Sequence, residues 1–120
     1  MLNKTSHIME VTILLANTMQ FILLLIYIVA PTAVTFNGST EARVELNSYF
    51  AVLCTAADGN PPPTLTWTFP STSSAKQSPG GGGQLLYFES AKRSDTGNYR
   101  CEGTNVVGVA SETLDFKTLG

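Results

Sequence analysis

The sequence predicts an all-β domain built as a two-layer antiparallel sandwich, and three observations lead to this fold class. Apolar residues recur at every second position in several short stretches, whereas no stretch keeps helical spacing for three turns. Clusters of Gly, Pro, Asn and Ser separate these stretches. Two cysteines far apart in the sequence, Cys54 and Cys101, lie at inward positions of two such stretches, so a bridge between them is expected to join two layers.

Six short stretches alternate in this way, and each is expected to form a strand. In chain order they are residues 44–46, 50–56, 65–69, 86–88, 99–103 and 114–116. The turn signals between them lie at residues 47–48, 58–63, 94–97 and 105–108. Many short strands at such spacing are typical of a sandwich or barrel.

Residues 70–84 break this pattern. They show no alternation and contain four consecutive glycines among serines. Such a composition favours flexible chain, so we expect a long Gly/Ser-rich loop here, with the strand at this place short or missing. The glycines do not form a phosphate-binding loop, because neither a lysine nor a helix follows them.

Residues 1–33 have the layout of a secretory signal peptide. Ten apolar residues, 21–30, follow a start that carries Lys4, and small residues suited to signal peptidase end the segment. An uncleaved signal anchor stays open as an alternative, because residues 11–33 are numerous enough to span a bilayer. Either interpretation exports residues 34–120 to the cell surface or the extracellular space, where cysteines oxidise.

Composition and charge argue against several function classes. Only 13% of the residues are charged and the net charge is −2, so there is no basic excess to hold nucleic acid. The single histidine, His7, lies in the leader, and no nucleophile–base pair or dense acidic ladder is found. Glu112 and Asp115 are expected in solvent near a strand end. We therefore expect no catalysis, no metal and no cofactor.

Four segments carry a resemblance to a known family. Cys54, Trp67 and Cys101 have the order and spacing found in an immunoglobulin domain. Residues 95–101, D-T-G-N-Y-R-C, resemble the family's D-x-G-x-Y-x-C. Residues 59–67, G-N-P-P-P-T-L-T-W, are similar to the family's G-x-P-x-P-x-I-x-W approach to its third strand. The turn N-V-V-G that follows Cys101 resembles that of the intermediate subclass, or I-set, and the resemblance covers about residues 34–118.

The resemblance implies a Greek-key I-set sandwich over residues 34–120, with one inter-sheet disulfide between Cys54 and Cys101. It implies that the Trp67 ring fills the space beside this disulfide. Closing so long a loop removes roughly 4 kcal/mol of unfolded-state entropy, which is a large share of the stability of a small domain.

The resemblance also assigns roles at one corner of the sandwich. Tyr99 is expected to bury its ring and to bond upstream backbone through its hydroxyl. Asp95 is expected to accept local N–H groups, and Gly97 to give the turn backbone freedom. The family often places a basic residue opposite this aspartate, and Lys76 is the one candidate here.

Strand parity predicts an apolar outer face on one sheet. With Cys54 inward, Tyr49 and Leu53 point outward, and Leu85 and Tyr87 point outward on the neighbouring strand. A contiguous apolar patch tends to mark an interface, so these four residues form a candidate partner face. The outer face of the other sheet is expected to be polar, from Thr64, Thr66, Thr68, Asn98, Arg100, Glu102, Thr113, Asp115 and Lys117. Three valines in one turn, Val106, Val107 and Val109, form a second candidate surface.

The resemblance implies a recognition module in cell adhesion or at the cell surface that binds a protein partner, homophilic or heterophilic. Two alternatives stay open. One is the ligand-binding ectodomain of a signalling receptor with a kinase or phosphatase domain further on, and the other is a secreted single-domain modulator or matrix component. Membrane contact is expected only through the N-terminal segment or a span beyond this sequence. Asn37-Gly-Ser39 is an N-glycosylation sequon in a segment expected to be exported.

Overall fold

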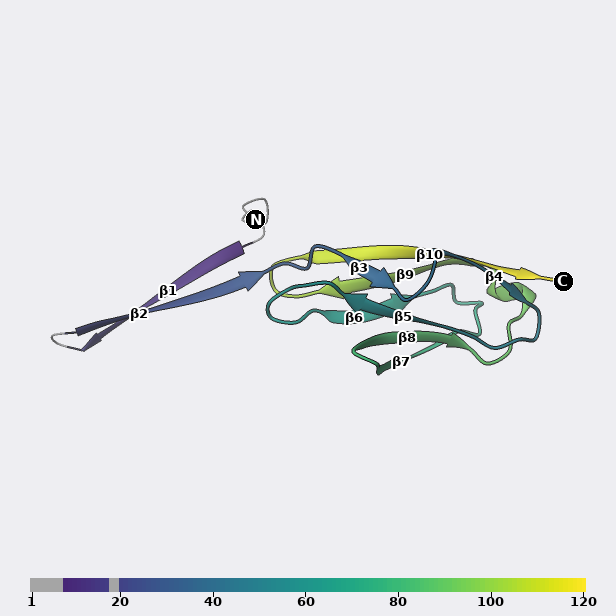
Figure 1. The fold of residues 1–120 in the computed structure, drawn as a ribbon, viewed down its shortest axis with the longest axis horizontal. Helices are drawn as coiled ribbons and strands as arrows, with labels where there is room; N and C mark the ends of the chain where they lie inside the picture. The colour runs from purple at the N-terminus through teal and green to yellow at the C-terminus, as the bar shows by residue number, and fades with distance from the viewer. Residues whose placement is uncertain (1–7, 18–19) are drawn as a thin grey trace.

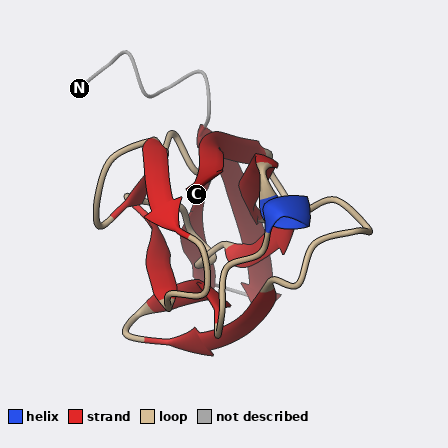
Figure 2. Cartoon of the chain, turned by 90° about the vertical axis from the view of Figure 1, so that its right-hand side faces the viewer, coloured by secondary structure: helices blue, strands red, loops and turns tan. Residues whose placement is uncertain are grey.

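The computed structural model describes residues 8–17 and 20–120 of the chain. Near the N-terminus, β1 (Ile8–Asn17) and β2 (Gln20–Val29) pair as an antiparallel hairpin that extends away from the rest of the chain (Figure 1). The remaining strands form two sheets that face each other (Figures 1 and 2). That residues 1–33 act as a leader stays a prediction, and residues 1–7 and 18–19 of this segment lie outside the described residues.

The two sheets contain four strands each. Sheet I is antiparallel, in the order β3 (Val34–Phe36), β5 (Phe50–Ala56), β8 (Gly83–Phe88) and β7 (Lys76–Gly80). Sheet II has the order β4 (Glu41–Glu45), β10 (Val109–Leu119), β9 (Gly97–Thr104) and β6 (Thr64–Thr68), and it is mixed because β4 runs parallel to β10. One short 3-10 turn, η2 (Arg93–Asp95), joins β8 to β9. The predicted all-β sandwich is confirmed.

Alternation along the strands builds the core between the sheets. Successive side chains of a strand point to opposite faces, so inward residues alternate with outward ones. At one end of the core the rings of Phe88 and Phe116 stack with centroids 4.3 Å apart, and Tyr99 meets both rings edge-on at 5.4 and 5.8 Å. Because all three side chains are fully buried, each contributes roughly 1.5–3 kcal/mol through the apolar area it removes from water.

Residues 76–88 correct one prediction made from the sequence. In place of a loop throughout residues 70–84, the chain forms β7, turns at Gly81 and Gly82, and returns as β8. Both turn glycines have positive φ, 60° and 80°, which is the backbone of a two-residue hairpin turn. The strand escaped prediction because β7 is polar and contains a proline, Pro79, which a sheet tolerates at its edge.

The packed domain begins before Val34, the residue at which the sequence places its start. Val29 exchanges two backbone hydrogen bonds with Asn60, at 2.7 and 2.8 Å. The backbone N–H and hydroxyl of Thr32 donate to the two carboxylate oxygens of Asp58, both at 2.7 Å. Ala30 is 4% exposed. Residues 29–33 are therefore part of the domain, and a leader that ends before Val29 would leave these contacts intact.

We expect a chain that starts at Val34 to be less stable than one that starts at Tyr27 by about 2–3 kcal/mol, because it lacks several hydrogen bonds worth about 1 kcal/mol each. Urea unfolding measures the difference. The Asn60 side-chain amide donates to the Tyr27 carbonyl at 2.8 Å. Asn60→Ala, which removes this bond, provides the control, since it should cost more in the longer chain than in the shorter one. Equal stability of the two chains would show that residues 29–33 are dispensable.

The glycines of the β7–β8 hairpin predict a graded series. A Cβ on Gly83 would lie 2.0 Å from the carbonyl oxygen of Cys54, so Gly83→Ala should cost about 2–3 kcal/mol of unfolding free energy. Gly82→Ala meets no atom but keeps a positive φ, which costs about 1 kcal/mol. Gly80→Ala meets neither problem and serves as the matched control. Equal unfolding free energies for Gly83→Ala and Gly80→Ala in chemical denaturation would contradict the β7–β8 hairpin.

Candidate functional site

Two side-by-side links join the sheets at the centre of the sandwich. The predicted disulfide joins Cys54 on β5 to Cys101 on β9, with Cα atoms 6.6 Å apart. Phe36 lies directly opposite Cys54 in sheet I, and Trp67 lies directly opposite Cys101 in sheet II. The Phe36 and Trp67 rings stack with centroids 5.1 Å apart. The disulfide and the stacked rings therefore join the two sheets at the same level.

Two glutamines fix the position of Trp67. Its ring N–H donates to the carbonyl of Gln84 at 2.9 Å. The side-chain amide of Gln77 accepts from the Trp67 backbone N–H at 2.9 Å and donates to the Trp67 carbonyl at 3.0 Å. Gln84 in turn donates to the same Gln77 oxygen at 3.0 Å. This set of hydrogen bonds escaped prediction, because Gln77 and Gln84 lie in the segment expected to be a loop.

Asp95 is a fully buried carboxylate held by neutral donors. Its Oδ1 accepts from the Ser74 backbone N–H at 2.6 Å, and its Oδ2 accepts from the Ser74 hydroxyl and the Lys92 backbone N–H, both at 2.8 Å. Lys76, the basic residue considered opposite Asp95, pairs with Glu89 at 3.1 Å instead. Ser74 donors therefore bind the Asp95 carboxylate, in place of the basic residue considered there.

Tyr99 lies at the same corner and is fully buried. Its buried hydroxyl donates to the carbonyl of Asp95 and lies 2.7 Å from the Ser73 hydroxyl. Burial raises the pKa of Tyr99 above its ordinary value of 10.0; the Ser73 hydrogen bond lowers it, and the nearby Asp95 carboxylate raises it. Gly97 lies between Asp95 and Tyr99 in the sequence, where it begins β9 with a φ of 157°.

The register of sheet I aligns three of the four residues named for the partner face. Leu53 lies directly opposite Leu85, and Tyr87 lies opposite Ala51 in the next row. Directly opposed residues share a face, so the row is continuous across β5 and β8. Tyr49 precedes β5 and is 62% exposed, whereas the other three are half-buried.

The glycine turn accounts for part of the burial of this row. A Cβ on Gly81 would lie 3.2 Å from the Leu53 Cδ2 atom, so the turn lies against Leu53. The outer face of sheet II is different in kind: its residues are polar and mostly exposed, and Arg100 pairs with Glu102 at 3.1 Å. The two outer faces therefore offer contrasting surfaces.

The turn between β9 and β10 contacts the N-terminal segment. The Asn105 side chain accepts from the Val107 and Gly108 backbone and donates to the carbonyls of Val29 and Pro61 at 2.7 and 3.0 Å. Around this link the exposed large apolar residues are Tyr27, Val106 and Val109, at 50%, 79% and 55%. The valine turn is thus exposed at its tip, and Asn105 fixes its base.

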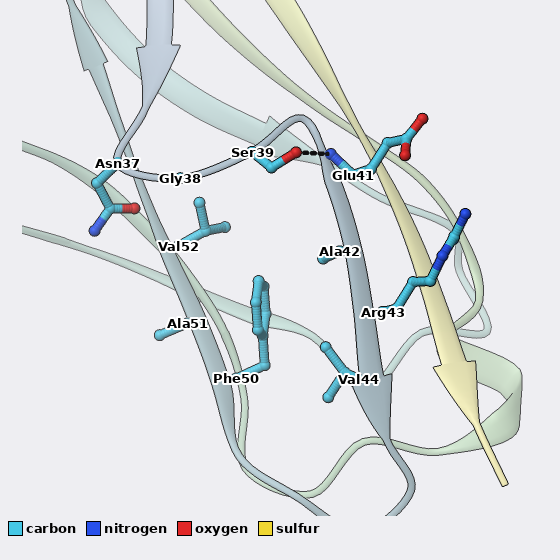
Figure 3. A pocket seen from close by; sticks show the side chains of 10 residues that line it. All are labelled: Asn37, Gly38, Ser39, Glu41, Ala42, Arg43, Val44, Phe50, Ala51 and Val52. Atoms are coloured by element: carbon cyan, nitrogen blue, oxygen red, sulfur yellow. Dashed lines mark hydrogen bonds between the residues drawn. The ribbon is translucent and has the colours of Figure 1, made fainter.

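A groove of about 370 Å³ opens where the chain crosses from β3 to β4 (Figure 3). The ring of Phe50 points into it, while Glu41 and Arg43 point away (Figure 3). Within the described ranges no group of three or more His, Cys, Asp or Glu residues could hold a metal ion. No helix there has the length and apolar character needed to cross a membrane. Apolar residues such as Ala42, Phe50 and Val52 line the groove together with Glu41 and Arg43.

Two facing sheets joined by one disulfide and a stacked aromatic pair are the fold of an immunoglobulin domain, and the family comparison agrees with this class. The immunoglobulin domain family model matches residues 31–105, more than half of the chain. The chain belongs to the immunoglobulin domain family.

Relatives of this chain are much longer proteins. It is 35% identical over 81 residues to mouse sialic acid-binding Ig-like lectin 10, a match that covers 67% of this chain and 12% of that protein. It is 37% identical over 66 residues to rat immunoglobulin superfamily member 10, covering 49% and 2%. It is 34% identical over 82 residues to mouse hemicentin-2, covering 66% and 2%. The chain therefore corresponds to a small part of each relative.

Solved structures share the fold. A chain of the titin M10–obscurin-like 1 immunoglobulin complex matches with a TM-score of 0.59 at 22% identity, covering 75% of this chain and 95% of its own. The seventh immunoglobulin domain of Dscam1 matches with a TM-score of 0.60 at 18% identity, covering 72% and 98%. At these identities the likeness concerns the fold alone.

The Asp95–Tyr99 corner predicts a pH-dependent loss of stability. Tyr99→Phe should lower the unfolding free energy by about 1–2 kcal/mol at neutral pH, because its hydroxyl hydrogen bonds are lost. The raised pKa of Tyr99 stabilises the fold fully below pH 10.0, and this contribution falls as pH rises above that value because only the unfolded phenol ionises. The two stability curves should therefore converge above pH 10.0 in denaturant titrations. A constant gap up to about pH 11 would contradict this role.

Proposed function

We propose that this chain is an exported immunoglobulin domain of the intermediate subclass that recognises a protein partner through the outer face of sheet I. The observation that carries the proposal is the apolar row of that face: Leu53 opposes Leu85, Tyr87 lies in the next row, and Tyr49 is exposed beside them. Residues near the N-terminus then act as the leader or anchor that brings the domain to the cell surface or outside the cell.

The composition around the row supports an interface. Polar residues of β7 border it on one side, because Ser78 lies opposite Leu85 and Lys76 lies opposite Tyr87. An apolar centre with a polar rim is the usual arrangement of a protein–protein contact, and tyrosine is enriched in such contacts. The outer face of sheet II, with its threonines and the Arg100–Glu102 pair, lacks an apolar centre.

A second copy of the domain is the first partner to test. An apolar face that meets itself across a two-fold axis is complementary by symmetry, whereas a different protein must supply a matching surface. The relatives support a recognition role, since one is named as a sialic acid-binding lectin. Adhesion is the role in which such a contact joins two cells.

We expect the double substitution Leu53→Lys and Tyr87→Lys to abolish self-association measured by sedimentation equilibrium. Two unpaired charges in a buried contact cost several kcal/mol, which is at least tenfold in the dissociation constant. Circular dichroism and the urea midpoint should stay close to those of the unsubstituted chain, because both side chains point out of the core.

The matched control places the same charges on the opposite face. Thr66→Lys with Thr113→Lys adds two lysines to exposed positions of sheet II and should leave association unchanged. Association that survives Leu53→Lys with Tyr87→Lys would exclude this face. A chain that stays monomeric at every concentration would exclude the second copy as the partner.

A further inference from the structure

The sequon residue Asn37 lies at the end of the same apolar row. The backbone N–H of Asn37 donates to the Leu53 carbonyl at 3.1 Å, which extends the β3–β5 pairing by one residue beyond Phe36. Leu53 in turn opposes Leu85, and Leu85 opposes Ser78. One row therefore crosses sheet I from Asn37 through Leu53 and Leu85 to β7.

The side chain of Asn37 has a fixed orientation. Its Oδ1 accepts from the Leu53 backbone N–H at 2.8 Å, taking the place of the backbone carbonyl that leaves the sheet as the chain crosses to β4. In Figure 3 the side chains of Asn37 and Ala51 point to the same side of β5, opposite to the Phe50 ring. The Nδ2 atom, which takes the sugar in a sequon, thus lies on the outer face of sheet I.

Space around Asn37 permits a bulky group. Asn37, Gly38 and Ser39 are all exposed, and a Cβ placed on Gly38 would meet no atom within 4 Å. Attachment at Nδ2 retains Oδ1 as an acceptor, so the hydrogen bond to Leu53 and a glycan are compatible. The role of Asn37 in ending β3 therefore does not conflict with modification.

We propose that Asn37 carries an N-linked glycan whose first sugars lie over Leu53 and Leu85, so that occupancy of this site limits access to the apolar face. The competition with a partner rests on the function proposed above. In the transfer, Nδ2 bonds to the anomeric carbon of the sugar, the bond from that carbon to a lipid-linked diphosphate breaks with its electron pair, and one Nδ2 proton leaves to a base. The donor is a lipid diphosphate-linked oligosaccharide.

This placement follows from contact chemistry. Sugar rings present apolar C–H faces that pack on exposed apolar side chains, and a row beginning at the attachment point offers such contacts without loss of hydrogen bonds. Tyr49 lies outside this row, since it precedes β5, and Tyr87 lies one row further along. The glycan therefore covers the leucines first and leaves the tyrosine end more open.

Attachment is tested on the full chain secreted from eukaryotic cells. Treatment with an amidase that removes N-glycans should lower the mass of the unsubstituted chain and of Ser39→Thr, which keeps the sequon. The same treatment should leave Ser39→Ala and Asn37→Asp unchanged. Asn37→Asp also keeps an oxygen for the Leu53 N–H, so a folding defect does not obscure the result. A secreted chain with no mass change at Asn37 would overturn the proposal.

Coverage is tested by hydroxyl-radical footprinting, which needs no partner. Oxidation of Leu53 and Leu85 should rise several-fold on removal of the glycan, while oxidation of Val106, at the far turn, should stay constant. Equal oxidation of the two leucines with and without the sugar would show that the glycan points elsewhere, even if it is attached.

Sedimentation separates this proposal from the function on which it rests. If the face binds a second copy, Asn37→Asp and Ser39→Ala should associate several-fold more strongly than the glycosylated chain. Equal association of all forms overturns the competition and leaves the face intact. Association by none of them excludes a second copy as the partner, while footprinting still decides whether the sugar covers Leu53 and Leu85.

Discussion

The link between the two sheets at the Cys54–Cys101 level is the constraint on which the rest of the structure depends. Cys54 and Cys101 each lie opposite an aromatic residue in their own sheet, and those two rings stack on each other. The disulfide restricts the unfolded chain, and the stacked rings fill the space beside it in the folded one. Strand registers on either side of this level then decide which residues reach the outer faces.

Local pattern sufficed for the residues whose role depends on strand parity or on a short motif. Alternation around Cys54 and Cys101 put both cysteines inward, and the motif ending at Cys101 located the corner occupied by Asp95 and Tyr99. The hairpin at Gly81 escaped prediction because β7 is polar, and polarity there reflects a tertiary bond from Gln77 to Trp67. The alternation of apolar and polar residues does not reveal such a hydrogen bond.

The candidate partner face likewise combines features that strand parity predicts with features that depend on strand pairing. Parity correctly places Leu53 and Leu85 on one side of their strands, but pairing decides that they lie opposite each other. That Asn37 completes their row depends on where β3 leaves sheet I, and that the glycine turn contacts Leu53 depends on a hairpin that sequence reasoning did not find. Contacts across strands require a register, which a single sequence does not specify without the turns that set it.

The glutamine that holds Trp67 has a further consequence, at the margin of the sandwich. β6 is the last strand of sheet II, and the Gln77 amide occupies both backbone groups of Trp67 that a newly arriving strand would use. β7, the last strand of sheet I, carries Pro79, which has no N–H to offer. The β6 and β7 edges therefore offer fewer free backbone groups to a strand of another molecule, whereas the side chains on the faces stay available for contact.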